Sequence, residues 1–281
     1  MRPLARLALS FALLGAALPA SAQTLDHIRE TGEIRLGIRS DAAPLSYVDA
    51  EGRPSGYTPT VCAHVAELIA IDLELENLNA NFVPVDAEDR FEKVANGDID
   101  LLCGAATITI ERRETVDFSI PTFVDGTAVL LPVGSGTDFS ALAGKKVGVR
   151  AGTTTEEILA NSLEAAGVQA EIVAFDTHDA GLAGLENGEI SAYFGDQSIL
   201  YELFHKSDLS ENFTMSDNTL TIEKQGLALR RGDADFRLVV DRALSQLYAS
   251  GTMREIFQGA FPGATPGLAL KALYLIAPDL P

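Results

Sequence analysis

The chain contains few cysteines, few positive charges and few long apolar runs. It has 2 cysteines and 4 histidines, and its 21 Lys and Arg residues stand against 40 Asp and Glu, so the formal net charge is −19. A surface this acidic argues against nucleic acid or an anionic membrane as a partner. The sequence shows no metal-ligand spacing, no Ser/His/Asp set and no phosphate-binding loop. The composition therefore favours none of the common enzyme or nucleic-acid-binding classes.

One long apolar run, residues 7–18, lies at the start of the chain. It follows Arg2 and Arg6 and precedes the small residues 20–22. This order is typical of a secretory signal peptide, and the run is shorter than the roughly 20 apolar residues that span a bilayer. We expect residues 1–22 to be removed on export to the periplasm, which leaves 259 of the 281 residues and, without the two arginines, a net charge of −21. The residue directly after the cleavage site is Gln23 and not a cysteine, so a lipoprotein anchor is not expected.

The two cysteines are expected to form a disulfide. Cys62 falls in a predicted helix and Cys103 at the end of a predicted strand, both in the first half of the chain. Outside the cytoplasm a cysteine pair is more often bonded than free. The alternative is two buried thiols, which pack as small apolar side chains.

The mature chain is long enough for two lobes of roughly 100 to 150 residues, each with its own core. Strands are predicted at 33–38, 81–84, 99–102, 128–133, 146–150, 171–174, 191–194 and 226–230. Helices are predicted before Gly32, at 59–70, 87–96, 155–166, 234–250 and 253–258, and in a segment that ends at residue 185. This alternation predicts an α/β fold, with a mostly parallel sheet and helices on both faces in each half. The Gly-Ser-Gly sequence at 134–136 marks the expected crossing between the lobes.

The segment from Gly104 to Ser119, GAATITIERRETVDFS, brings an arginine next to small residues at a strand end. Gly104 and Ala105 leave backbone N–H groups accessible, and Thr107 adds a hydroxyl. The guanidinium of Arg112 is a planar fork that fits a carboxylate with two hydrogen bonds. We therefore expect a carboxylate clamp here. The alternative is a solvated charge cluster that opens a helix.

This segment resembles the [AG]-x-T-x-T-x-E-R-x-x-x-[VI]-D-F-[ST] signature of bacterial periplasmic amino-acid-binding proteins, the receptors of polar amino-acid ABC transporters (solute-binding protein family 3). The resemblance covers about residues 25–262. It implies the type II periplasmic-binding-protein (Venus-flytrap) fold, in which two α/β lobes joined by two hinge strands enclose a ligand. It also implies a monomer that needs no cofactor.

The resemblance divides the chain into lobe 1, residues 23–130 and 226–262, and lobe 2, residues 131–225. A tail, residues 263–281, extends past the usual end of the family. Its apolar residues predict either a helix packed on a lobe or a surface for dimerisation.

Further motifs are closest to the subgroup that binds glutamate and aspartate. GIRSDAAPLSY places Arg39 at the rim of the cleft, EDRFEKVANGD places Arg90 there, and HDAGLAGLENG contributes His178. VRAGTTTEE turns at Gly152 into a helix whose first N–H groups, at Thr153 and Thr154, suit an anion; ordinary helix capping is the alternative for both threonines. In SAYFGDQS, Asp196 corresponds to the family's acceptor for the ligand ammonium; a helix cap is its alternative.

These positions imply capture of an L-amino acid and its delivery to a membrane permease. Arg112, Thr107 and the Thr153 region would hold the α-carboxylate, and Asp196 the ammonium. The remaining cleft residues, Arg39, Arg90 and His178, would face the side chain. A neutral side chain would leave the two guanidiniums unpaired, so the pattern favours glutamate or aspartate.

Several alternatives remain open. Alanines at 87, 105 and 106 replace hydroxyl residues of the subgroup, and Arg90 has Asp86 and Asp89 as other partners, so glutamine, asparagine or a broad range of ligands is not excluded. An enzyme similar to cyclohexadienyl dehydratase would use cleft carboxylates such as Glu156, Glu157 and Asp196. A freestanding amino-acid sensor is the third alternative.

Overall fold

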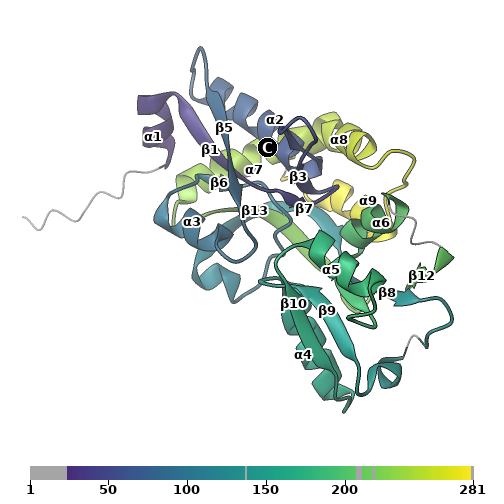
Figure 1. The fold of residues 1–281 in the computed structure, drawn as a ribbon. Helices are drawn as coiled ribbons and strands as arrows, with labels where there is room; N and C mark the ends of the chain where they lie inside the picture. Colours follow the sequence, from purple (N-terminus) through teal and green to yellow (C-terminus); the bar gives the residue numbers. More distant parts are fainter. Residues whose placement is uncertain (1–23, 137, 207–210, 217–218, 280–281) are drawn as a thin grey trace, which may run out of the picture.

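The computed structural model describes residues 24–136, 138–206, 211–216 and 219–279. The expected signal peptide, residues 1–22, lies outside the described residues. The structure has two lobes, each built around its own five-stranded sheet (Figure 1). In the described part of the chain, no helix has both the length and the apolar character needed to cross a membrane.

The sheet of lobe 1 has the strand order β5-β1-β6-β13-β7. Three strands are parallel: β1 (Glu33–Arg39), β5 (Asn79–Val85) and β6 (Leu101–Leu102). Strand β13 (Glu223–Arg230) is antiparallel to both β6 and β7 (Val116–Asp125). A short three-stranded sheet lies beside it, formed by β2 (Asp41–Ala42), β3 (Ser46–Val48) and β4 (Pro54–Ser55). The predicted mostly parallel sheet is confirmed, with an antiparallel return at one edge.

Two cores cover the two faces of this sheet, because successive side chains of a strand point to opposite faces. Leu101 and Leu229 pack in a core with helices α1 (Thr24–Thr31), α2 (Tyr57–Asp72), α7 (Ala234–Ser250), α8 (Thr252–Ala260) and α9 (Leu268–Ile276). Their neighbours Leu102 and Ala228 pack on the other face, with Val94 of α3 (Arg90–Asn96). The 3-10 turn η1 (Arg112–Glu114) precedes β7.

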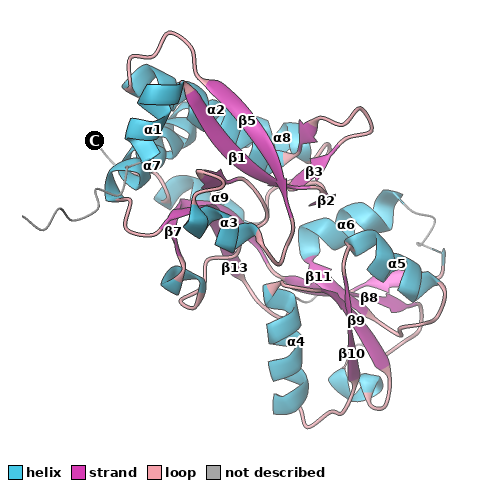
Figure 2. Cartoon of the chain, turned by 60° about the vertical axis from the view of Figure 1, so that its left-hand side comes forward, coloured by secondary structure: helices cyan, strands magenta, loops and turns pink. Residues whose placement is uncertain are grey.

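Lobe 2 repeats this arrangement with the strand order β10-β9-β11-β8-β12. Figure 2 shows this lobe apart from lobe 1. Its strands are β8 (Thr127–Pro132), β9 (Lys146–Arg150), β10 (Glu171–Phe175), β11 (Tyr193–Asp196) and β12 (Phe213–Met215). Helix α4 (Thr154–Ala165) covers one face, and α5 (His178–Glu186) and α6 (Gln197–Lys206) cover the other. The turn η2 (Phe139–Leu142) packs with the α4 core through Phe139 and Leu142.

The chain changes sheets at Gly126, earlier than the expected crossing at 134–136. Strand β8 pairs with β11, in the register Asp196 to Thr127, so it belongs to lobe 2 and not to lobe 1. A Cβ atom at Gly126 would lie 2.2 Å from the carbonyl oxygen of Thr221, which shows how tightly the two connecting segments pack. We call these segments, around Gly126 and Thr221, the hinge. An apolar strand fits either sheet equally well, so only its pairing decided the point of crossing.

The predicted elements agree with the structure along most of the chain, and β9 and α7 match in both bounds. Strands β7 and β12 and helix α6 were not predicted. Pro121 interrupts the strand pattern of β7, but β7 is an edge strand, where proline is tolerated.

The C-terminal tail packs on lobe 1 as helix α9. Leu270, Leu273 and Tyr274 are buried in the lobe 1 core, and the backbone N–H of Asp279 donates to Ser245 Oγ at 3.1 Å. Of the two alternatives for the tail, the helix packed on a lobe is the one that the structure shows.

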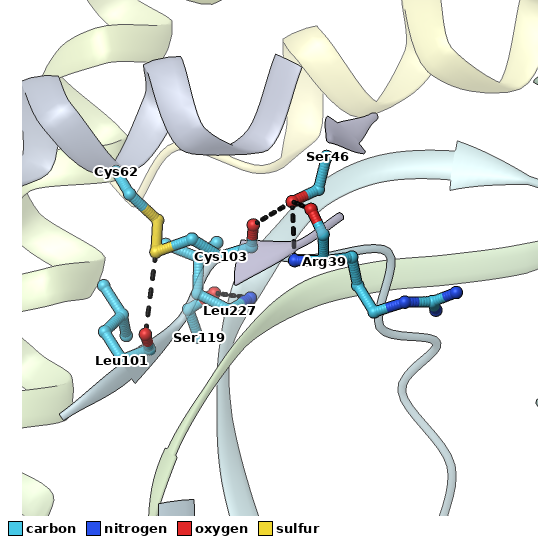
Figure 3. The surroundings of a disulfide bond; sticks show 7 residues. All are labelled: Arg39, Ser46, Cys62, Leu101, Cys103, Ser119 and Leu227. Carbon is cyan, nitrogen blue, oxygen red and sulfur yellow. Dashed lines mark hydrogen bonds between the residues drawn. A yellow bond between two sulfur atoms is a disulfide. The ribbon is translucent and has the colours of Figure 1, made fainter. Parts of the chain in front are cut away.

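A disulfide joins Cys62 of α2 to Cys103, the residue after β6, with a Cα–Cα distance of 6.1 Å (Figure 3). The carbonyl oxygen of Cys103 accepts a hydrogen bond from Ser46 Oγ at 3.0 Å, and the backbone N–H of Arg39 donates to the same Ser46 oxygen at 3.0 Å. The disulfide thus ties the strand end that leads into the Gly104 to Ser119 segment to α2, and the Ser46 hydroxyl connects it to the end of β1.

Candidate functional site

Most of the residues singled out from the sequence line a cleft between the lobes. It lies where β1 and β6 of lobe 1 end opposite the ends of β9 and β11 of lobe 2. Its lining consists of Arg39, Arg90, Ala105, Thr107, Arg112, Arg150, Thr153, Thr154, Thr155, His178, Gly195, Asp196 and Ile199. Nine of the ten predicted residues are among them. The tenth, Gly104, lies behind Arg39: a Cβ atom at Gly104 would be 3.2 Å from Arg39 Cγ.

Arg90 is buried in this cleft without an anion. Its side chain is 1% exposed, and Nη1 and Nη2 both donate to the carbonyl oxygen of Gly152, at 3.2 and 3.3 Å. Its Nε has no hydrogen-bond partner among the described residues. The alternative pairing with Asp89 does not form, because that carboxylate pairs with Lys93 at 2.7 Å. Burial, with Arg112 and Arg39 nearby, holds the pKa of Arg90 well below its ordinary value.

Arg112 likewise forms no ion pair within the described part of the chain. Its Nη1 donates to the carbonyl oxygen of Thr107 at 2.9 Å, and burial lowers its pKa. The guanidinium carbons of Arg112 and Arg90 lie 4.8 and 4.5 Å from the centre of the Phe91 ring. We call Arg90 and Arg112 the open pair. Two cations held on one aromatic ring create a strong attraction for anions in the cleft.

The other two cleft arginines have carboxylate partners. Arg39 Nε donates to Asp41 Oδ1 at 2.7 Å, and Arg150 Nε donates to Asp41 Oδ2 at 2.9 Å. Arg150 Nη1 also donates to Glu88 Oε1 at 2.7 Å. Burial acts to raise the pKa of Asp41, but the two arginines outweigh it and leave that pKa lowered. We call these four residues the bridge cluster, because Arg150 of lobe 2 reaches two carboxylates of lobe 1.

Asp196 lies at the end of β11 and faces the cleft. It accepts a hydrogen bond from Gln225 Nε2 at 2.9 Å. The cap of the following helix, α6, comes instead from Asp125 in the hinge, which accepts from the Ser198 backbone N–H at 3.3 Å and from the Ser198 hydroxyl. Burial, followed by the charges of Asp125 and Glu223, raises the pKa of Asp196 to about 8. A cation placed beside this carboxylate would favour its ionised form.

His178 is an uncharged polar group at the edge of the cleft. It is the first residue of α5 and is buried, with Nδ1 3.0 Å from the hydroxyl of Tyr193. Burial, followed by the charge of Arg39, lowers the pKa of His178 to about 3. The imidazole is therefore neutral near pH 7 and offers a hydrogen bond rather than a positive charge.

The N-terminus of α4 points its first residues at the cleft. Thr153 precedes the helix in an extended conformation, but its hydroxyl donates back to the carbonyl oxygen of Arg150 at 2.7 Å and makes no capping bond. Gly152 has φ +68°, and a Cβ atom there would lie 3.2 Å from the backbone of Ala87 in lobe 1. Glycine thus permits both the turn and the close contact between lobes. The positive end of the helix adds to the attraction for anions.

Glu223, at the start of β13, received no role from the sequence. It is buried and accepts hydrogen bonds from four threonine hydroxyls: Thr107 at 2.8 Å, Thr127 at 3.1 Å, Thr154 at 2.9 Å and Thr221 at 2.6 Å. Nothing in its local sequence sets it apart from other glutamates, because its four partners come from separate segments. Arg150, also missed, had a signal: it ends a predicted strand two residues before the Gly-Thr-Thr turn.

Comparison with known proteins agrees with this geometry. Residues 34–263 match the sequence profile of "Bacterial extracellular solute-binding proteins, family 3". The chain is 32% identical over 259 residues to the L-glutamate/L-aspartate-binding protein of Pseudomonas aeruginosa, covering 92% of this chain and 86% of that protein. It is 30% identical over 277 residues to the glutamate/aspartate import solute-binding protein of Escherichia coli K12, covering 98% and 92%.

A solved structure shows the same architecture. The ancestral amino acid-binding protein AncCDT-1, described as a precursor of cyclohexadienyl dehydratase, superposes with a TM-score of 0.75 at 26% identity, covering 85% of this chain and 99% of that one. The two-lobed periplasmic-binding-protein fold expected from the sequence is confirmed.

Proposed function

The chain belongs to the bacterial extracellular solute-binding proteins, family 3, and from this premise we propose that it captures L-glutamate or L-aspartate in the periplasm, as a monomer, and delivers it to a membrane permease. The two relatives described above carry glutamate and aspartate in their names. Their names describe binding and import, which supports a receptor rather than an enzyme.

The open pair is the observation that carries this proposal. Arg39 and Arg150 are balanced by Asp41 and Glu88 within the protein. Arg90 and Arg112 have no such partner among the described residues, and Asp196 faces the same cleft without a cationic one. An acidic L-amino acid carries two carboxylates and one ammonium group, which matches the two unpaired cations and the one carboxylate. A neutral amino acid would leave one buried guanidinium without an anion, so it would forgo the ion pair that an acidic side chain forms there.

The charged and polar groups of the cleft then have distinct roles. Arg112 and the N-terminus of α4 hold the α-carboxylate, and Asp196 holds the ammonium. Arg90 pairs with the side-chain carboxylate, and His178 contributes a neutral hydrogen bond beside it. Arg39 also lines the cleft, but its charge is already paired with Asp41, so we assign it to the wall that holds the lobes together.

Thermal melting and calorimetry on the mature protein test the proposal. Protein that has been unfolded and refolded to remove carried-over ligand is screened against the twenty L-amino acids. Saturation at one hundred times the dissociation constant stabilises the fold by about 2.7 kcal/mol, which gives a clear shift in Tm. Selective shifts with L-glutamate or L-aspartate support the proposal. Shifts with L-glutamine and L-asparagine but not with the acids would remove Arg90 from its role.

The dehydratase alternative needs its own test. AncCDT-1, a binding protein with this fold, is described as a precursor of cyclohexadienyl dehydratase. Incubation with prephenate or arogenate, followed by product analysis, is expected to show no turnover. Turnover together with no response to any amino acid would replace the receptor function by the enzymatic one.

A further inference from the structure

The hydroxyl cluster around Glu223 spans both lobes. Thr107 comes from lobe 1, Thr154 is the first residue of α4 in lobe 2, and Thr127 and Thr221 belong to the hinge. A single buried carboxylate thus connects the two lobes and the segments that join them. Only Thr107 and Thr154 of these four threonines also line the cleft.

The number of hydroxyl protons limits the hydrogen bonds that Thr107 and Thr154 can make with a ligand. A threonine hydroxyl has one proton to donate and two lone pairs that accept, whereas a carboxylate only accepts. Thr107 and Thr154 lie 2.8 and 2.9 Å from Glu223, but their hydroxyl oxygens are 3.4 Å from each other. Both protons are therefore directed at Glu223. What remains toward the cleft is a pair of lone-pair acceptors, which a carboxylate cannot use and an ammonium group can.

Asp196 lies in the same part of the cleft and is held by the same strand. Gln225 follows Glu223 by two residues on β13, so the two side chains leave the strand on the same side. Gln225 Nε2 donates to Asp196, and its backbone forms a bridge with Thr107. Strand β13 thus gathers one carboxylate and two hydroxyl acceptors into a corner that suits a cation, within a cleft otherwise rich in arginine.

We propose that Glu223 is a positioning residue that makes the Thr107 and Thr154 hydroxyls acceptors for the ligand ammonium, and that it joins the two lobes through the same hydrogen bonds. This inference rests on the proposed function, since it assigns the ammonium end of the ligand. It assigns the ammonium group to oxygen acceptors organised by Glu223, next to the arginines and the helix N-terminus that serve the carboxylates.

The test compares L-glutamate with glutarate, which keeps both carboxylates and has no ammonium group. In Glu223→Gln the amide nitrogen donates toward the threonines and turns at least one hydroxyl proton into the cleft. We expect the affinity for L-glutamate to fall about 10- to 100-fold, as for the loss of a charge-assisted hydrogen bond with a donor left facing a cation. Affinity for glutarate, measured by calorimetry, is expected to stay within about 2-fold, since no changed group faces a carboxylate.

Thr154→Val provides a second variant if Glu223→Gln unfolds at the assay temperature. It removes one acceptor at nearly constant volume and is expected to weaken L-glutamate about 10-fold while sparing glutarate. Glu164→Gln, on the exposed face of α4, is the matched control and should change neither affinity.

Equal losses for L-glutamate and glutarate would show a merely structural role for Glu223 and overturn the inference. Unchanged affinity for L-glutamate would overturn it as well. Wild-type protein that binds no amino acid would refute the receptor function, and this inference with it, which distinguishes the two failures.

Discussion

The two pairs of arginines in the cleft behave in opposite ways, although all four are largely withdrawn from solvent. In the bridge cluster, Arg39 and Arg150 share the carboxylate of Asp41, and Arg150 also holds Glu88. In the open pair, the guanidiniums of Arg90 and Arg112 donate to carbonyl oxygens, have no carboxylate partner among the described residues and lie over the Phe91 ring. The difference teaches that burial alone does not identify a binding residue. A buried cation whose charge is balanced within the protein holds structure together, whereas one left unbalanced is poised for a ligand.

Removing Arg112 is expected to have the largest effect on this contrast. Arg112→Ala should lower the affinity for every amino acid by about 1,000-fold, near 4 kcal/mol of binding free energy, because all of them carry an α-carboxylate. Calorimetry with L-glutamate and L-glutamine measures the loss. Arg112→Lys keeps the charge without the planar fork and should recover only part of the affinity. If Arg112→Ala binds amino acids with normal affinity, Arg112 does not hold the α-carboxylate.

Replacing Arg90 separates binding from stability. Arg90→Met should lower the affinity for L-glutamate about 100-fold and leave the affinity for L-glutamine nearly unchanged. The same variant should raise the Tm of the ligand-free protein, because it removes a buried cation that lacks an anion. A lower Tm, or an equal loss for both ligands, would place Arg90 with the structural arginines.

Replacing Arg150 should have the opposite sign on stability and a smaller effect on affinity. Arg150→Met leaves Asp41 and Glu88 without their partner across the lobes. We expect a lower Tm of the ligand-free protein, and about a 10-fold loss of affinity that is the same for all amino acids, since closure is weakened and no ligand contact is removed. Small-angle scattering should show a larger radius of gyration. A loss confined to acidic ligands would assign Arg150 to ligand recognition.

The smallest effect concerns pH and Asp196. Its pKa, raised to about 8, means that the folded ligand-free protein binds more protons than the unfolded chain between about pH 4 and pH 8. The free energy of unfolding should therefore fall as pH rises through this window, by at most about 1.4 kcal/mol per pH unit from this group. Chemical denaturation at several pH values should show this slope, and Asp196→Asn should reduce it.

Ligand binding should reverse that proton uptake. An ammonium group beside Asp196 lowers its pKa, so binding at pH 7 should release protons. Calorimetry in buffers of different ionisation enthalpy counts them. Proton uptake instead of release would mean that the ammonium group lies elsewhere.

The fold and most of the residues that line the cleft could be predicted from the sequence. The strand-helix alternation predicted β9 and α7 to the residue, because each has a strong period and clear turn signals at its ends. The spacing around Thr107 and Arg112 pointed to the clamp segment, and the Gly152 turn pointed to the helix N-terminus opposite. These are local patterns, which can be recognised without knowing how the rest of the chain folds.

What the sequence left undecided was which groups pair with which. Asp41 stands two residues from Arg39, yet its second partner, Arg150, lies 109 residues further along the chain. The four threonines of Glu223 likewise come from separate segments, and strand β8 could have joined either sheet. The sequence by itself determined the two α/β lobes, the order of the motifs and the presence of several arginines near the strand ends. Only the tertiary structure decided which arginines were neutralised, because Coulomb and hydrogen-bond energies depend on distances that the folded chain sets.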